Sequence, residues 1–204
     1  MTRVRHLIAD QRGASAAEFA LVLPLLLIVL FGTIDVGRYA WSLSQAEKAT
    51  QIGARWAVAT DMVASGLYSY SFATQGGVPQ GTTVTATAFP GVVCQSNGGT
   101  ASCNCMAACS FPTTASTTAF TNLVTRMAQI YPGLSADNVV VTYAWSGLGF
   151  SGDPNGPDVA PLTTVSLRNL NYTPFTALIF GGQIALPSFA YTLPMEDGSG
   201  TSSN

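Results

Sequence analysis

An apolar run near the N-terminus constrains this chain more than any other feature. Residues 20–34 are almost wholly apolar, and small residues extend the run back to residue 14. As a helix of about 21 residues it would be roughly 31 Å long, enough to span the hydrocarbon core of a bilayer. A removable signal peptide would need a small-residue cleavage site just after its apolar core, and residues 32–38 (GTIDVGR) hold no such pattern. The sequence therefore predicts a retained transmembrane helix.

A single carboxylate, Glu18, lies in the N-terminal part of this run. An ionised group at membrane depth costs on the order of a few kcal/mol. Glu18 therefore needs a positive partner, yet no basic residue follows it before Arg38. A cut after Gly13 would create one, because the new amine of Ala14 would lie at a similar depth. In a bundle of such helices, Glu18 of one subunit would neutralise the Ala14 amine of a neighbour, which favours assembly over catalysis.

The orientation in the membrane follows from a basic cluster on the other side of Gly13. This cluster consists of Arg3, Arg5, His6 and Arg12. Because basic segments stay in the cytoplasm, we expect residues 1–13 to form a cytoplasmic leader and the chain after Asp35 to be periplasmic. The predicted location is the inner membrane, with a single pass.

The same segment resembles a known processing site. Gly13, four small residues, Glu18, Phe19 and a leucine-rich helix together resemble the prepilin peptidase site of the tight-adherence (Flp) pilus systems. Residues 12–60 are similar to the opening of TadE-like pilus assembly proteins, and a fainter similarity returns at residues 163–196.

The resemblance implies a minor pseudopilin that a prepilin peptidase cuts between Gly13 and Ala14. It implies that Glu18 and Phe19 register neighbouring subunits. The expected partners are other pilus or pseudopilin subunits and inner-membrane assembly proteins, in a homo- or hetero-oligomer or an extracellular filament. The alternative is a permanently anchored periplasmic binding or scaffold module of a secretion or adhesion apparatus.

The composition argues against several other functions. Charged residues make up 9% of the chain and hydrophobic residues 48%, with a net charge of −2. A nucleic-acid-binding domain would show a basic patch or stripe, so we expect no nucleic acid partner. Residues 7–204 contain no histidine, which removes Ser–His and Cys–His catalytic pairs from the exported part. Since the acidic residues are few and scattered, the sequence predicts no enzyme, no catalytic residue and no cofactor.

A turn-rich loop at residues 147–161 imitates two ligand sites. Residues 147–152 (GLGFSG) fit the G-x-G-x-x-G pattern, but the proline after Asp153 excludes the helix that a dinucleotide site requires. Asp153, Asn155 and Asp158 are similar to a calcium loop, but the glutamate at the twelfth position and the flanking helices are missing. We therefore expect a surface loop without a metal.

Four cysteines lie close together, and an oxidising compartment would pair them. They are Cys94, Cys103, Cys105 and Cys109. A bond between Cys103 and Cys105 would close a very small, strained ring. Two pairings remain: Cys94–Cys103 with Cys105–Cys109, or Cys94–Cys105 with Cys103–Cys109. The rival interpretation is a zinc site, which is disfavoured because zinc ligands usually come as Cys-x2–4-Cys pairs, often with histidine.

Helical periodicity continues beyond the apolar run, which predicts one helix over residues 14–60. The alternative is two helices hinged near residues 32–37. Outside the membrane, an apolar stripe recurs at three- and four-residue intervals: Tyr39, Leu43, Ala46, Ala49, Ile52 or Gly53, and Trp56. Asp35 and Arg38, three residues apart, are expected to form a local ion pair.

The predicted fold class is α+β, with a long N-terminal transmembrane, pilin-like helix followed by a small antiparallel sheet of three or four strands and one further packed helix. The expected strands are residues 82–89, 138–145, 163–172 and 183–195, the last broken at Pro187. The further helix is expected at residues 116–131. The predicted domains are the leader (1–13), the long helix (14–60), a periplasmic domain (61–195) and a disordered tail (196–204).

Overall fold

The computed structural model describes residues 13–154 and 156–200. The basic leader ahead of Gly13 lies outside the described residues. By its internal contacts the chain divides into two compact units. Within the described residues, the first unit holds the chain up to Trp41 together with Tyr172–Ile184, and the second holds Ser42–Asn171 with the chain from Ala185 onward.

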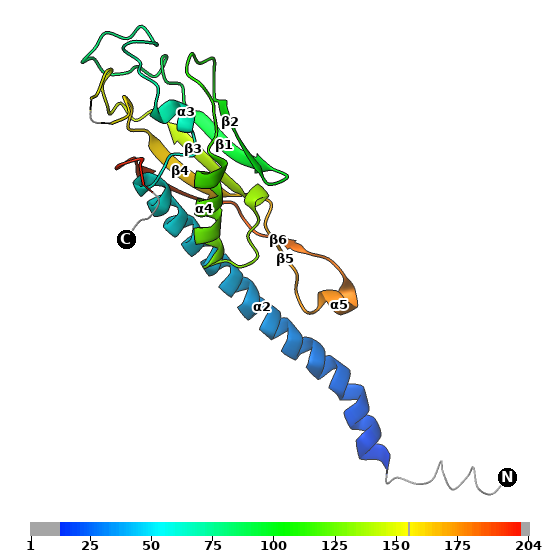
Figure 1. Ribbon diagram of the computed structural model, residues 1–204. Coiled ribbons are helices and arrows are strands. Elements are labelled where there is room, and N and C mark those ends of the chain that lie inside the picture. Colours follow the sequence, from blue (N-terminus) through cyan, green and yellow to red (C-terminus); the bar gives the residue numbers. More distant parts are fainter. Residues whose placement is uncertain (1–12, 155, 201–204) are drawn as a thin grey trace, which may run out of the picture. The chain divides into compact units, whose positions relative to one another are not determined.

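A single long helix, α2 (Ala14–Ala59), begins directly after Gly13 (Figure 1). It is unbroken over residues 32–37, so the alternative of two hinged helices is wrong. Pro24 lies inside the helix without ending it. Apolar and small side chains dominate the first half, and good helix formers without proline continue it to Ala59, which explains why one helix forms.

The second unit is built on a five-stranded antiparallel sheet in the order β2-β1-β3-β4-β7. Its strands are β1 (Val92–Asn97), β2 (Thr100–Cys105), β3 (Val139–Ala144), β4 (Leu162–Leu167) and β7 (Phe189–Pro194). The α+β class is confirmed, although the sheet has one more strand than the three or four expected.

Two of these strands were not expected. Strands β1 and β2 form a hairpin in the cysteine-rich segment, joined by Gly98 and Gly99. Both glycines have positive φ, 62° and 85°, as the tight turns that suit a twisted hairpin require. By contrast, residues 82–89 form turns and no strand. The alternation of apolar and polar residues there does not reflect a strand: Val84 and Phe89 are buried side chains of a loop.

Two expected strands are each divided. The strand predicted at 163–172 ends at Leu167, where Asn169 adopts a φ of 54°, and resumes as β5 (Asn171–Tyr172). The strand predicted at 183–195 consists of β6 (Ile184–Ala185) and β7, on either side of Pro187 as expected. Strands β5 and β6 pair with each other and enclose the short helix α5 (Ala177–Phe180).

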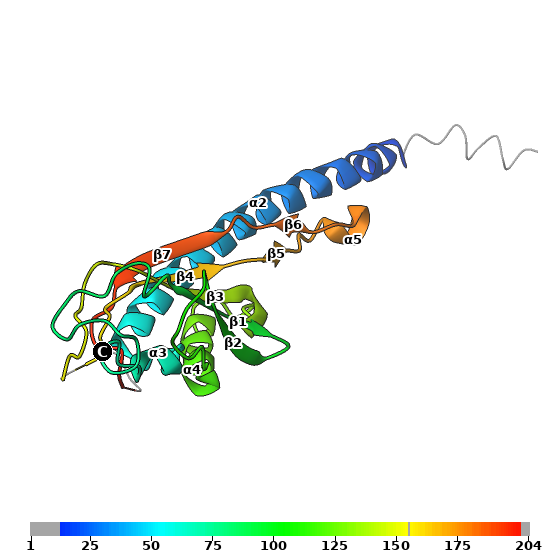
Figure 2. The ribbon, with the colours of Figure 1, turned by 90° about the horizontal axis from the view of Figure 1, so that it is seen from above.

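The predicted second helix is confirmed as α4 (Thr117–Ala128). The hydroxyl of Ser116 caps it by accepting a hydrogen bond from the amide of Ala119 at 3.2 Å. Figure 2 shows α4 beside the sheet of the second unit. Its buried face consists of Phe120, Leu123 and Met127, the apolar positions that the helical spacing singled out.

The core of the second unit lies between one face of the sheet and its helices. Alternate residues of β3, namely Val139, Val141 and Tyr143, are fully buried. The part of α2 that belongs to this unit contributes small residues: Ala46, Ala49, Gly53, Ala54 and Ala57. A Cβ on Gly53 would lie 2.6 Å from Sδ of Met127, so the absence of a side chain lets α2 and α4 approach closely.

The C-terminal segment is tied to the end of α2. The amides of Glu196 and Asp197 donate to the carbonyl of Val58, and Gly200 exchanges hydrogen bonds with Asp61. A disordered tail was predicted from residue 196 onward, but residues 196, 197 and 200 form these hydrogen bonds. Residues 201–204 of the predicted tail lie outside the described residues.

Candidate membrane and assembly segment

The first half of α2 presents an apolar surface to its surroundings. Large side chains that a soluble helix would bury are exposed here, with Leu21 at 80% and Leu25 at 65%. Among the described residues, α2 is the one helix long and apolar enough to cross a membrane. Exposure of this many neighbouring apolar groups to water is unfavourable, so the segment fits a lipid or protein environment.

The predicted processing site lies at the start of this helix. Gly13 is exposed, and among the described residues a Cβ at that position would meet no atom within 4 Å. Ala14 is the first helical residue. Glu18 and Phe19 are both exposed. Ala14 and Glu18 are four positions apart in the helix, about one turn.

Asp35, at the outer end of the apolar run, is buried and contacts the β5–β6 hairpin through hydrogen bonds. Its carboxylate accepts hydrogen bonds from the amide of Phe175 at 2.7 Å and from the amide and hydroxyl of Thr176 at 2.8 Å each. The hydroxyl of Tyr172 lies 3.4 Å from the same carboxylate and 3.2 Å from the Asp35 carbonyl. One side chain thus fixes the hairpin to the helix.

The expected ion pair between Asp35 and Arg38 is wrong. The Asp35 carboxylate is committed to Phe175 and Thr176, and the Arg38 guanidinium lies 4.1 Å from the ring centroid of Phe175. Arg38 also lies 5.7 Å from the ring centroid of Tyr172, whose ring meets that of Tyr39 edge-on. The local rule fails because a distant part of the chain supplies hydrogen-bond donors to Asp35 and an aromatic ring to Arg38.

Two titrations are coupled to this arrangement. Burial raises the pKa of Asp35, but hydrogen bonds from Thr176, Phe175 and Tyr172 outweigh it, so the pKa lies below the ordinary value of 3.8. Burial raises the pKa of Tyr172; the charge of Arg38 opposes this rise, and the Asp35 carboxylate adds to it. Asp35 is therefore ionised, and Tyr172 is a neutral donor, at neutral pH.

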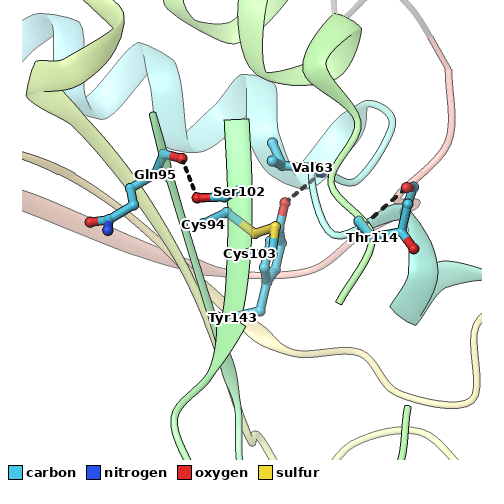
Figure 3. The surroundings of a disulfide bond; sticks show 8 residues. Val63, Cys94, Gln95, Ser102, Cys103, Thr114 and Tyr143 are labelled. Carbon is cyan, nitrogen blue, oxygen red and sulfur yellow. Dashed lines mark hydrogen bonds between the residues drawn. A yellow bond between two sulfur atoms is a disulfide. The ribbon is translucent and has the colours of Figure 1, made fainter. Parts of the chain in front are cut away.

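The four cysteines form two disulfides, Cys94–Cys103 and Cys105–Cys109. This is the first of the two pairings left open by the sequence. The first bond joins partners directly opposite each other on β1 and β2, as Figure 3 shows. Near this disulfide, the buried hydroxyl of Tyr143 accepts a hydrogen bond from the amide of Val63 at 2.9 Å (Figure 3).

The loop at residues 147–161 uses its acidic residues for structure. The buried Asp158 carboxylate accepts hydrogen bonds from the amides of Phe72 at 2.6 Å and Asp153 at 3.1 Å. Asn155 lies outside the described residues. No helix follows the glycines of residues 147–152, so the dinucleotide geometry is missing from this loop. No group of three or more potential metal ligands occurs within the part of the chain that is described.

Comparison with known families identifies the N-terminal segment. A family described as "TadE-like protein" matches residues 13–55. The match starts at the predicted processing site and covers the exposed apolar helix, Asp35 and Arg38. No curated protein and no solved structure matches the chain.

Proposed function

Since the chain is a TadE-like protein by its match over residues 13–55, we propose that it is a membrane-anchored, non-enzymatic minor pseudopilin of tight-adherence pilus assembly. In this proposal residues 14–34 hold the protein in the inner membrane, and a prepilin peptidase removes the leader after Gly13. The domain that follows Asp35 lies in the periplasm. From the membrane the protein enters the filament or its assembly tip.

The observation that carries the proposal is the combination of Gly13, Ala14 and Glu18 at the start of an exposed apolar helix. Gly13 is accessible to a peptidase. The helix offers an uninterrupted apolar surface for lipid and then for neighbouring subunits. The freed Ala14 amine and the Glu18 carboxylate, one helical turn apart, give the pair of opposite charges that registers one subunit on the next.

Assembly through this helix explains the partners that we propose. Pilus subunits make head-to-tail contacts, and a heterologous contact that does not close produces a helical filament. The exposed surface from Phe19 onward is uncharged as far as Asp35, which suits contact with other pilin-like helices. The proposed partners are pilus or pseudopilin subunits, inner-membrane assembly proteins and the prepilin peptidase.

The exported domain supports a structural role. Its well-buried carboxylates serve backbone amides, as Asp158 does for Phe72, and its thiols are joined in disulfides. Chemistry by a histidine-activated nucleophile is excluded because residues 7–204 lack histidine. The domain is a disulfide-stabilised platform suited to protein contacts.

The competing function is a permanently anchored periplasmic binding or scaffold module. A test that separates the two follows a tagged chain in the native host after filaments are sheared from the cells. A pseudopilin appears in the sheared filament fraction as well as in the membrane, whereas a permanent anchor stays in the membrane fraction alone. Glu18→Ala serves as the matched variant, since it should remain in the membrane and disappear from the filaments.

A further inference from the structure

The hairpin that Asp35 holds carries an unusual concentration of exposed apolar side chains. In helix α5, Leu178 is 90% exposed, Ile179 63% and Phe180 68%. Residues 169–195, which surround it, contain no charged residue. In water such a patch is unfavourable, so the segment requires an apolar environment that the chain itself does not supply.

The backbone of this segment is prepared for that environment. Each amide from residue 175 to residue 181 has an acceptor inside the first unit. Asp35 accepts from Phe175 and Thr176. The other five donate within the segment: Ala177 to Pro174, Leu178 to Phe175, Ile179 and Phe180 to Thr176, and Gly181 to Ala177. Because unpaired backbone N–H and C=O groups are costly in lipid, the pairing of these seven donors lowers the free energy needed to take the segment out of water.

The depth of the segment is set by its contacts with α2. Leu178 and Ile179 line one apolar groove together with Phe31, Ile34 and Phe175. Phe31 lies one helical turn before Asp35, about 6 Å closer to the membrane centre at the α-helical rise. Elements that lie in the membrane interface reach about 5–10 Å into the boundary between headgroups and acyl chains. The α5 side chains therefore lie level with the last turn of the apolar run.

The residues just beyond Asp35 suit the polar side of this boundary. Arg38 stacks on Phe175, and Trp41 is 67% exposed on the same helix. Tryptophan and basic side chains collect where hydrocarbon meets headgroups. The helix and the hairpin thus share one boundary, near residues 35–41.

We propose that residues 175–180 insert into the periplasmic leaflet of the bilayer beside α2, so that the protein contacts lipid through two elements. This inference rests on the proposed anchoring of α2 in the membrane. The occupant of the apolar face is lipid because the face continues the exposed surface of residues 19–34 without a charged residue between them. Asp35 holds the hairpin at that depth by accepting hydrogen bonds from the amides of Phe175 and Thr176.

Photocrosslinking of the full-length protein tests the proposal. The protein is reconstituted in vesicles of phosphatidylethanolamine and phosphatidylglycerol, with benzoylphenylalanine in place of Leu178. Two matched leucine positions serve as controls: Leu27 in the middle of the apolar helix, and Leu148, which is 57% exposed on a loop of the second unit. Mass spectrometry after irradiation distinguishes phospholipid adducts from adducts between protein chains.

We expect phospholipid adducts in comparable yield at positions 178 and 27, and no phospholipid adducts at position 148. Lipid adducts at Leu27 without any at Leu178 would overturn the inference and leave the anchoring intact. Absence of lipid adducts at Leu27 would overturn the anchoring and the inference with it. Crosslinks from Leu178 to a second copy of the chain, or equal lipid yields at Leu148 and Leu178, would also contradict insertion of α5.

Discussion

Asp35 and Thr176, separated by 141 positions in the chain, are joined by two hydrogen bonds of 2.8 Å each. The Asp35 carboxylate accepts both, one from the Thr176 amide and one from its hydroxyl. This contact connects the end of the apolar helix segment to the one hairpin that carries a comparable apolar surface within the described residues. The Asp35 carboxylate therefore contributes directly to the position of the hairpin.

Asp35→Ala should release the hairpin from α2. The part-buried amides of Phe175 and Thr176 lose their acceptor, which is unfavourable to the extent that water cannot replace it. Hydrogen exchange of these two amides should be clearly faster in the variant. Glu47→Ala is the matched control, because Glu47 is exposed on the same helix and accepts a long hydrogen bond of 3.5 Å from the side-chain amide of Gln51. Unchanged protection in Asp35→Ala would mean that the apolar contacts alone hold the hairpin.

Acid should have the same effect as Asp35→Ala in the wild-type protein. Because the pKa of Asp35 is lower in the folded state than its ordinary value of 3.8, the contact stabilises the hairpin fully above that value. The stabilisation is lost as the pH falls from 3.8 through the lower folded pKa. Exchange measured over this interval should accelerate at residues 175 and 176, and the acceleration should be missing in Asp35→Ala.

Glu18→Ala should leave membrane insertion and leader removal intact and impair assembly. Removal of the carboxylate should make membrane insertion more favourable by about a few kcal/mol, the cost of an acidic group at membrane depth. It also leaves the neighbour's Ala14 amine without a counter-charge. Glu18→Asp keeps the charge and should retain part of the assembly. Filament yield per cell is the measurement. Normal yield with alanine would rule out Glu18 as the registering charge.

The two disulfides should differ in their contribution to stability. By loop entropy, the nine-residue separation of Cys94 and Cys103 is worth about 3 kcal/mol and the four-residue separation of Cys105 and Cys109 about 2 kcal/mol. Cys94 and Cys103 are also buried, so their replacement by alanine adds a cavity. Urea unfolding of the two double alanine variants, made in the periplasm, should rank the Cys94–Cys103 pair as the larger loss. The reverse order would contradict the buried position of that bond.

Substitution of two glycines on α2 should have opposite effects. A valine at Gly53 would force its side chain against Met127, which overpacks the contact with α4 and costs about 1–3 kcal/mol. Gly37→Ala is the control, because a Cβ there meets no atom within 4 Å and alanine favours a helix by about 1 kcal/mol over glycine. Thermal unfolding of both variants decides the matter. If Gly53→Val were neutral, α2 and α4 would not be closely packed at this point.

Local patterns predicted the helices well. The apolar run and the absence of later prolines predict α2, and the spacing of Phe120, Leu123 and Met127 predicts α4, whose start Ser116 caps. The run of valines in residues 138–145 predicts the central strand β3. In each case the segment's own residues determine both its secondary structure and the face that it buries.

Features that depend on distant partners were missed. The cysteine cluster concealed the β1–β2 hairpin, although the Gly98-Gly99 pair between two short runs was a usable turn signal. The alternation at residues 82–89 was misleading because this segment pairs with no strand among the described residues. The role of Asp35 could not be predicted from its neighbours on the same helix, because its partners Phe175 and Thr176 lie about 140 positions later in the chain.

The most direct test of the central claim is the intact mass of the protein isolated from native-host membranes that contain the prepilin peptidase. The proposal predicts a chain that begins at Ala14. It also predicts that Gly13→Leu retains the leader, since the peptidase must fit its active site around a residue without a side chain, and a Cβ at Gly13 meets no atom within 4 Å in the described part of the chain. A wild-type chain that still begins at Met1 under these conditions would contradict the pseudopilin function and favour the permanent anchor.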